Sequence, residues 1–497
     1  MLKYFVLFNF ILTSFCFAQA ELKTLIAEGL EQAYNFNFKQ SEKIFNQAID
    51  DYPEYPHGYH YISQIKLWAY LGSKDEVEFK SFLTHSELAK IKGERLFKKN
   101  ENDPYISYLL GSIYTLRATA NSFKGSSLDA FWAAKSAVGF FETTLEIDEK
   151  FYDAYLGIGL FNYALSYVPG IFKWAINLSG LSYDKEKGME YIKLAYKKGH
   201  LDQTEAAFHL SKIYTDYVAE FDSASTLLEK LISKYPGNSL FHYQYAVLKI
   251  KARELEEAEN SLNKVLEIDH PKFYQTNSLS HFLMGDIYFK RNNFSEALKY
   301  YKKFLTTTID IDYTGIANYR AAISSFMLGD TVEMRERLLL ARMGNLDIPD
   351  DIYANEKSVE LLENGISENH KKVILAKNDV EAGRSLSAFT RLKEIADSIE
   401  VAEMRGIAYF YLSEAAYDIG NFETSIEYSK KASAIKYKTE KWVLPYAAYV
   451  TAKSNYEIGK YDRSRKFLEI AENNNDFEFK ESLEALVNNL TRKLDIL

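Results

Sequence analysis

The chain has 497 residues, of which 47% are hydrophobic and 26% charged, whereas a disordered chain is poor in apolar residues. The formal net charge of −9 disfavours nucleic-acid binding, because that binding depends on basic surfaces that face phosphates. A single cysteine excludes a disulfide scaffold and a cysteine-rich zinc site. Eight prolines accompany 38 tyrosines, 33 phenylalanines and 4 tryptophans, so few helix breakers and many bulky side chains favour an all-α fold.

The N-terminal residues 1–20, MLKYFVLFNFILTSFCFAQA, have the pattern of a secretory signal peptide. Lys3 precedes an apolar run from Tyr4 to Phe17, and Ala18-Gln19-Ala20 has the small-x-small form of a cleavage site. The run is shorter than the roughly 20 apolar residues that a membrane span needs. We therefore expect an exported protein, periplasmic or extracellular, with association with the cell envelope left open. The alternative for this segment is a buried first helix.

One spacing of small residues recurs along the chain. In residues 281–305, Gly285 and Ala297 lie 12 apart, and apolar residues recur three and four positions apart, as in two amphipathic helices. Small side chains at these positions let two antiparallel helices approach closely, and Gly329, Gly383, Gly420 and Gly459 mark turns between helices. Further copies of the frame have these paired positions: Gly29 and Ser41, Ser211 and Ala224, Ala246 and Ala258, Ala322 and Met334, Ala376 and Ala388, Ser413 and Ser425, and Ala452 and Ser464.

This frame resembles the tetratricopeptide repeat, a helix–turn–helix unit of about 34 residues, over nearly all of residues 22–475. The resemblance implies an all-α, right-handed solenoid of about 11 units, each contacting mainly its neighbours. We expect a first solenoid segment at residues 21–345, a connector at 346–367, a second segment at 368–476 and a capping helix at 477–497.

Two stretches depart from the frame by insertion, near residues 115–130 and 164–182. Insertions in repeat proteins form loops, often on the binding face. Lys173 is the one charged residue between residues 155 and 181, and Pro169-Gly170 divides this apolar stretch, so we expect a short helix there. Packing under the solenoid, docking to a partner and contact with a membrane interface all remain open. The residues that would make these contacts are Ile171, Phe172, Trp174 and Ile176.

The second insertion and the residues after it carry a further pattern, made up of Ser166 and Pro169, Gly180-Leu181, Asp184-Lys185, Gly188-Met189 and Ile192 to Ala195. Over residues 155–215 this pattern resembles the eukaryotic tetratricopeptide-repeat-protein-39 and inclusion-body-clearance family. Members of that family are regarded as non-enzymatic interaction factors, so the resemblance implies binding rather than catalysis. The N-terminal signal segment is a departure from that largely intracellular family.

Motifs for catalysis, cofactors and metals are missing from the sequence. It has no phosphate-binding loop, no Gly-x-Ser-x-Gly and no His-Glu-x-x-His. Gly157-Ile158-Gly159 lacks the later glycine of a dinucleotide loop, and close helix packing explains it better. His57 and His60 share a helix face, but two histidines alone make a weak metal site. We therefore expect no enzymatic activity, no cofactor and no metal.

The concave face of the superhelix is the remaining candidate site. The repeat resemblance implies that two residues of the first helix in each unit point into the groove. One lies three positions before the first small residue, as Phe282 does before Gly285, and the other lies seven positions after Phe282, at Phe289. Aromatic rings there suit an extended peptide or a partner helix, although they could instead pack across neighbouring units. Repeats that bind C-terminal carboxylates place Lys, Arg and Asn at these positions, so aromatic residues argue against that mode. The candidates are Phe208, Tyr243, Phe282, Phe289, Tyr319, Phe326, Phe410, Tyr417, Tyr449 and Tyr456.

Together these observations predict an exported, non-catalytic scaffold or assembly factor. It is expected to bind another protein through the concave face, through the inserted apolar helix or through both, with no nucleic-acid partner. Peripheral membrane contact through the inserted helix remains open. The alternative function is a secreted glycan-binding protein that stacks sugars on the groove aromatics.

Overall fold

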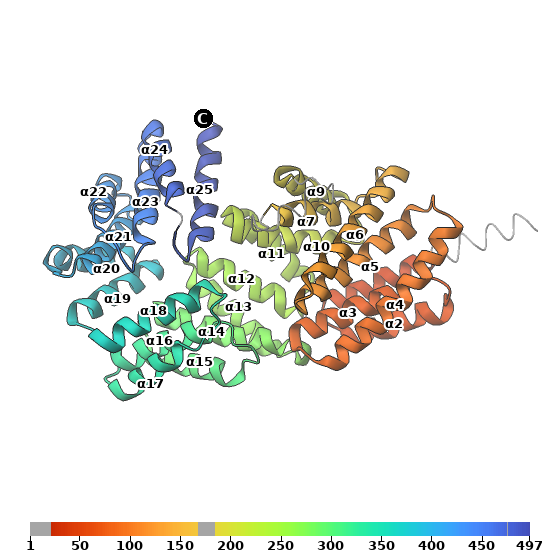
Figure 1. Ribbon diagram of the computed structural model, residues 1–497, viewed down its shortest axis with the longest axis horizontal. Helices are drawn as coiled ribbons and strands as arrows, with labels where there is room; N and C mark the ends of the chain where they lie inside the picture. The colour runs from red at the N-terminus through yellow and green to blue at the C-terminus, as the bar shows by residue number, and fades with distance from the viewer. Residues whose placement is uncertain (1–20, 167–183, 475) are drawn as a thin grey trace, which may run out of the picture. The chain divides into compact units, whose positions relative to one another are not determined.

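The computed structural model of the chain describes residues 21–166, 184–474 and 476–497. Every regular element in these residues is a helix (Figure 1), so the expected all-α fold is confirmed. The predicted signal segment, residues 1–20, lies outside the described residues, as does most of the second predicted insertion. Within the described part of the chain, no helix combines the length and the apolar character needed to cross a membrane.

The chain divides into two compact units, which we name the N-terminal unit and the C-terminal unit. The N-terminal unit comprises Met1–Leu210, Leu227–Phe241 and His270–Tyr274, and the C-terminal unit comprises Ser211–Thr226, His242–Asp269 and Gln275–Leu497. Residues 346–367, for which we predicted a connector, contain the helix α18 inside the C-terminal unit.

Paired antiparallel helices make up the N-terminal unit. They are the helix at residues 21–34, α2 (Phe38–Asp51), α3 (His57–Ser73), α4 (Glu76–Lys99), α5 (Pro104–Phe123), α6 (Ser127–Ile147), α7 (Ala154–Leu165), α9 (Lys185–Lys198), most of α10 (Gln203–Ile213), the second part of α11 (Phe221–Lys234) and the 3-10 helix η3 (Pro271–Phe273).

The C-terminal unit continues the same pattern. It contains the π-helix η2 (Tyr214–Val218), the first part of α11, most of α12 (Ser239–Lys251), α13 (Leu255–Ile268), all but the first residue of α14 (Tyr274–Lys290), α15 (Phe294–Thr307), α16 (Thr314–Met327), α17 (Thr331–Ala341), α18 (Pro349–Asn364), α19 (Glu368–Glu381), α20 (Ser385–Ile395), the 3-10 helix η4 (Ala396–Ser398), α21 (Ala402–Asp418), α22 (Phe422–Ser433), α23 (Val443–Glu457), α24 (Tyr461–Asn473) and α25 (Lys480–Asp495).

The recurring small residues are the points where the two helices of a repeat touch. Gly285 in α14 faces the buried ring of Tyr301 in α15, and a Cβ atom at Gly285 would lie 2.7 Å from that ring. In other repeats a serine at the second small position donates a hydrogen bond to the carbonyl oxygen of the first, 12 residues earlier: Ser41 to Gly29 (2.8 Å), Ser425 to Ser413 (2.8 Å) and Ser464 to Ala452 (2.9 Å).

The turn inside each repeat needs a residue in the left-handed conformation, seven positions after the first small residue. Glycine suits this position because it has no Cβ atom. Asn292 takes the same place with φ 61°, and the following Asn293 caps α15 by accepting a hydrogen bond from the Glu296 amide. The predicted turn glycines all have positive φ: Gly329 (88°), Gly383 (73°), Gly420 (78°) and Gly459 (71°).

Two irregularities of spacing have a local explanation. Ser211 and Ala224 lie 13 rather than 12 residues apart because the π-helix η2 inserts one residue before the turn, where Ala219 has φ 53°. The extra residues near 115–130 do not form a long loop. They lengthen α5 and α6 to 20 and 21 residues, and Gly125 (φ 75°) forms the turn between them.

In the N-terminal unit, α10 and the chain near Tyr235 cover the faces of the helix at 21–34, α3 and α5. The Gln64 side-chain amide donates to Glu205 (2.5 Å), and the Tyr108 hydroxyl donates to Asp202 (2.7 Å). The rings of Tyr34 and Tyr235 lie 5.5 Å apart. These faces are therefore occupied by the protein's own chain.

In the C-terminal unit, α25 packs beside α23 and α24 (Figure 1). Its apolar side is buried through Leu483, Val487 and Leu490. Asn489 and Arg492 extend from the same helix to the last turn of η2, where both side chains donate to the carbonyl oxygen of Val218 (3.2 and 3.1 Å). The last helix of the unit therefore contacts its first element.

Candidate functional site

The C-terminal unit contains a cavity of about 530 Å³. It is lined mainly by the first helices of successive repeats, α12, α14, α16, α19, α21 and α23, together with η2, α18 and α25. Its volume lies in the range of roughly 300–1,000 Å³ that is usual for ligand pockets. All of its lining residues belong to this one unit.

Aromatic side chains form much of the cavity wall. Trp442 is central, because its ring meets Phe410 edge-on at 5.2 Å and Tyr446 edge-on at 5.9 Å. Tyr353 and Phe479 make a similar contact at 5.6 Å. Edge-to-face packing of this kind holds rings in defined orientations. Of the described residues, ten aromatic ones line the cavity: Phe221, Phe289, Tyr319, Tyr353, Phe410, Tyr411, Trp442, Tyr446, Tyr449 and Phe479.

The cavity brings together four of the ten aromatic residues that the repeat frame singled out. They are Phe289 on α14, Tyr319 on α16, Phe410 on α21 and Tyr449 on α23. The helices that carry them are separated by up to 160 positions in the chain, so only the winding of the solenoid places them around one space.

The other six predicted aromatic residues lie elsewhere. Phe282 is only 6% exposed and packs in the core against Tyr301 and Phe304. Phe208 belongs to the N-terminal unit, where its ring lies 5.5 Å from that of Phe241. Half-buried positions outside the cavity lining are occupied by Tyr243, Phe326, Tyr417 and Tyr456. The predicted contact residues of the insertion, Ile171, Phe172, Trp174 and Ile176, lie outside the described residues.

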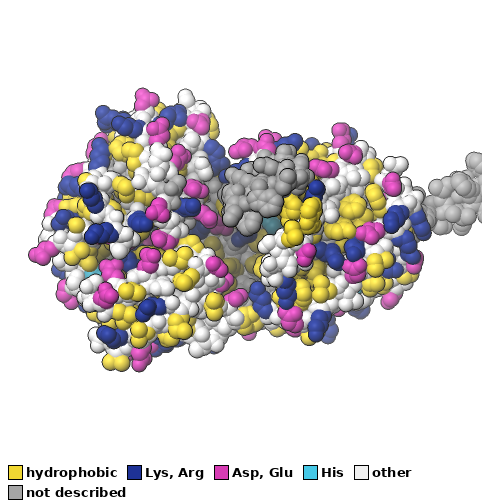
Figure 2. All heavy atoms as spheres, in the orientation of Figure 1, with side chains coloured by type: hydrophobic (Ala, Val, Ile, Leu, Met, Phe, Trp, Pro, Cys, Tyr) yellow, Lys and Arg dark blue, Asp and Glu magenta, His cyan; other side chains and the backbone are white. Residues whose placement is uncertain are grey.

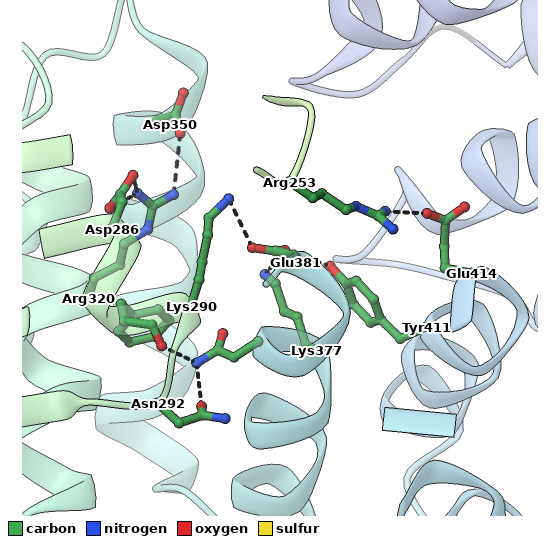
Figure 3. A network of polar contacts seen from close by, with 12 residues as sticks. Arg253, Asp286, Lys290, Asn292, Arg320, Asp350, Lys377, Glu381, Tyr411 and Glu414 are labelled. Atoms are coloured by element: carbon green, nitrogen blue, oxygen red, sulfur yellow. Dashed lines mark hydrogen bonds and ion pairs between the residues drawn. The ribbon is translucent and has the colours of Figure 1, made fainter. Parts of the chain in front are cut away.

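Charged side chains also border the cavity, in a network that sequence reasoning missed (Figure 3). On one side, Arg320 of α16 donates from Nη1 to both carboxylate oxygens of Asp286, at 2.5 and 2.6 Å. Its Nη2 lies 3.8 Å from Asp350 of α18. Burial raises the pKa of the Asp350 carboxyl, and Arg320 opposes that rise. Arg320 therefore holds two carboxylates on one side of the cavity.

Glu381 is the centre of a second group in the network (Figure 3). Its carboxylate lies 3.3 Å from Lys290 and 3.7 Å from Lys377, and it accepts a hydrogen bond from the Tyr411 hydroxyl at 3.5 Å. Burial alone raises the pKa of a carboxyl, but the lysine ammonium groups outweigh it and lower the pKa of Glu381 to about 2. Glu381 is therefore an anion over the whole physiological pH range.

Arg253 joins helices that are far apart in the chain. It stands in the left-handed turn after α12 (φ 63°) and contacts Glu414 at 2.5 Å and Asp418 at 2.6 Å, both on α21. Lys453 of α23 contacts Glu414 from another side at 2.7 Å. Although burial opposes ionisation, Lys453 and Arg253 lower the pKa of Glu414 to about 2.

A periodic signal for these charges is present in the sequence. In several first helices a charged residue follows the inward aromatic position by four and by eight residues. Residues four apart on a helix lie on the same face, so the charges extend the stripe that begins with the aromatic ring. Examples are Phe282, Asp286 and Lys290; Phe410, Glu414 and Asp418; and Tyr449, Lys453 and Glu457.

The two neighbouring histidines of α3 are structural. His57 is buried and stacks on Tyr105 at 5.0 Å, and His60 is buried with its Nε2 3.1 Å from the Ser112 hydroxyl. Burial lowers the pKa of each to about 3, so both are neutral at physiological pH. In residues 21–166, 184–474 and 476–497, no cluster of three or more His, Cys, Asp and Glu side chains is arranged to hold a metal ion.

The sequence matches the model of a known repeat-protein family. Residues 80–337, just over half of the chain, match the sequence model of the Iml2/Tetratricopeptide repeat protein 39 family. The chain belongs to this family. Both predicted resemblances are thereby confirmed. The matched region of this Iml2/Tetratricopeptide repeat protein 39 family member includes Arg253, Asp286 and Arg320 of the charged network, whereas α19, α21, α23 and α25 follow it.

Solved structures of repeat proteins are similar at low identity. The tetratricopeptide-repeat domain of P58(IPK) is 15% identical, with coverage of 83% of this chain and 96% of that chain and a TM-score of 0.22. Yeast Tom70 is 11% identical, with 96% of each chain covered and a TM-score of 0.23. The human IFIT1 dimer with PPP-AAAA is 13% identical, covering 83% of this chain and 94% of that chain, with a TM-score of 0.35. No curated protein sequence matches the chain.

Proposed function

We propose that this protein is a non-catalytic scaffold that binds a segment of another protein in the cavity of the C-terminal unit. The observation that carries the proposal is the set of ten aromatic residues that line one cavity within the described part of a repeat solenoid. Solenoids of stacked repeats use extended concave surfaces for binding. Tyrosine and tryptophan side chains supply large contact areas at a small cost in conformational entropy.

Two of the carboxylates that line the cavity are unsuited to acid–base catalysis near neutral pH. Glu381 and Glu414 both have a pKa of about 2 because cations surround them. An efficient general base has a pKa close to the working pH, so these two carboxylates are poor bases near neutrality. Burial also raises the pKa of the lining phenols of Tyr319, Tyr411 and Tyr449, which keeps their protons in place.

The surface charge supports a protein partner in preference to a nucleic acid. The chain has a formal net charge of −9. On the face shown in Figure 2, Lys and Arg side chains are interspersed with Asp and Glu side chains over the described residues. A nucleic-acid site instead concentrates cations along one surface.

We further propose that the protein is exported. The support is the pattern of residues 1–20, with Lys3, an apolar run and the ending Ala18-Gln19-Ala20. Mass spectrometry of the protein from its native host tests this directly. A mature N-terminus at Glu21 is expected, and a chain that retains residues 1–20 inside the cell would contradict export.

Two tryptophan substitutions on α25 test the binding proposal. Ser482 is exposed and lines the cavity, so Ser482→Trp fills space in the cavity without removing a core side chain. Glu484 is exposed on the same helix and is not part of the cavity lining, so Glu484→Trp is the matched control. The full-length parent and both variants are used to capture proteins from a cell-envelope extract of the native host.

A protein partner that the parent and Glu484→Trp retain, and that Ser482→Trp loses, is the expected result. Circular dichroism melts that match the parent show that a variant is folded. Retention of the same partner by all three proteins would place binding outside the cavity. The Phe172→Ala, Trp174→Ala variant then tests the second insertion as the docking site.

A further inference from the structure

The cations that line the cavity are already paired with carboxylates. Lys377 is the most loosely held, and it still has Glu381 at 3.7 Å. The pairing leaves no described cation of the lining without an anion in ion-pair contact. The shortest pair for each lining cation is Lys251 with Asp216 (2.6 Å), Arg253 with Glu414 (2.5 Å), Arg320 with Asp286 (2.5 Å), Lys377 with Glu381 (3.7 Å) and Lys453 with Glu414 (2.7 Å).

The lining carboxylates are paired in the same way. Asp350, the most loosely held of them, lies 3.8 Å from Arg320, and Glu381 and Glu414 each contact two cations. Figure 3 shows several of these pairs between neighbouring helices. Among the residues that the structure describes, the cavity therefore presents charges of both signs that already neutralise one another.

A charged group on a ligand would gain little from such a wall. A ligand carboxylate that contacts Lys377 or Arg253 closely either displaces Glu381 or Glu414 from that cation, or lies beside that carboxylate, which has the same charge, in a partly buried site. Leaving one member of a buried ion pair without its partner is strongly unfavourable. The same reasoning applies to a ligand ammonium group that competes for Asp350 or Asp216.

The aromatic rings of the cavity wall provide an apolar contact surface that needs no charge on the ligand. Trp442, Phe410 and Tyr446 form one edge-to-face cluster, and Tyr353 with Phe479 forms another contact of this kind. Bulky apolar side chains that replace water over such rings bind through area and shape, without any charge on the ligand.

We infer that the cavity takes an uncharged stretch of the partner polypeptide, with two or three bulky aliphatic or aromatic side chains and with no charged side chain or chain terminus inside. This inference rests on the proposed function, because it names the chemistry of the segment that occupies the same cavity. The paired charges hold the surrounding helices, and the rings make the contact.

Selection from a random 12-residue peptide display library tests the inference. The library is panned on the full-length parent and counter-selected on Ser482→Trp, with Glu484→Trp as the control that must still bind. Peptides with adjacent Leu, Ile, Phe, Trp or Tyr residues, and without Asp, Glu, Lys or Arg among them, are expected. Their dissociation constants should change less than about twofold between 50 and 500 mM salt, because no new ion pair forms.

The results of the peptide selection test the inference, and the results of the capture experiment test the proposed function, so that failure of one can be told from failure of the other. Enrichment of acidic, basic or C-terminal-carboxylate peptides, or a loss of affinity of about tenfold or more in high salt, overturns the inference while the proposed function stands. Absence of any peptide that depends on Ser482 also overturns it and points to a non-peptide occupant. The proposed function itself fails if the captured partner is indifferent to Ser482→Trp.

Discussion

Arg492 in the last helix donates a hydrogen bond of 3.1 Å to the carbonyl oxygen of Val218, which lies 274 positions earlier in the chain. Val218 ends the π-helix η2, and Ala219 follows in the left-handed conformation. Carbonyl groups at a helix end lack partners within that helix. Asn489 and Arg492 supply the missing donors, and Ser482 and Leu486 of the same helix line the cavity.

Removal of both donors should loosen this contact. For Asn489→Ala, Arg492→Ala we expect the free energy of unfolding to fall by about 1–3 kcal/mol, because the carbonyl oxygens at the end of η2 lose their hydrogen bonds. Urea unfolding followed by circular dichroism measures the change. Lys493→Ala, an exposed substitution on the same helix, should leave stability unchanged. Equal stability of the double variant and the parent would show that the contact contributes nothing.

The same Gly→Ala change should have opposite effects at two sites. At Gly285 a new Cβ atom would lie 2.7 Å from the buried Tyr301 ring, so we expect a loss of about 1–3 kcal/mol in unfolding free energy. At Gly139 in α6 no atom of the described residues beyond the adjoining backbone of that helix lies within 4 Å of a new Cβ atom. Gly139→Ala should therefore stabilise the helix by about 0.5–1 kcal/mol. Thermal melts of the parent and both variants measure whether each substitution raises or lowers the stability.

Two aromatic residues at the same repeat position should behave differently. Phe282 is a core residue, so Phe282→Ala should cost about 3–5 kcal/mol of unfolding free energy. Tyr319 is half-buried and lines the cavity, so Tyr319→Ala should cost less stability and weaken binding of a captured partner about tenfold or more.

Unfolding curves and titration with that partner separate the two effects. A folded Tyr319→Ala protein with unchanged affinity would argue against a binding role for this ring. An equal loss of stability in both variants would show that Tyr319 is a core residue as well.

Glu205 in the N-terminal unit should make stability depend on pH. Burial raises its pKa from the ordinary value of 4.5 to about 7, against hydrogen bonds from Tyr34 and Gln64. The pKa of Glu205 is higher in the folded state than in the unfolded state. The stabilisation of the fold by protonated Glu205 is therefore fully present below pH 4.5 and is lost as the pH rises through 7. When the pH falls from 7.5 to 5.5, the unfolding free energy of the parent should therefore increase by about 2 kcal/mol relative to that of Glu205→Gln.

The quantity to compare is the difference in unfolding free energy between the parent and Glu205→Gln at each pH, because other groups in both proteins also titrate. His57 and His60 have their pKa lowered to about 3 by burial, so they act in the opposite sense and remove stability as the pH falls below 6.5. Both proteins contain these histidines, so their contribution cancels in the difference. Urea unfolding at a series of pH values measures it, and a difference that does not vary with pH would contradict a raised pKa at Glu205.

The sequence by itself determined the elements and their local contacts. Gly285 faces Tyr301 and Ser425 bonds to Ser413 because these contacts lie within one repeat, where the spacing of 12 residues and the 3.6-residue helical period set them. The left-handed turn at Gly420 is local in the same way.

Only the tertiary structure decided which inward positions form a site. Phe282 and Tyr319 share one repeat position, yet the first is core and the second lines the cavity. Arg253 meets Glu414 across 161 positions, and Trp442 and Phe479 join the wall from outside the repeat pattern. Small rotations between successive repeats add up along the solenoid, so the pairing of distant helices depends on all of the packing between them.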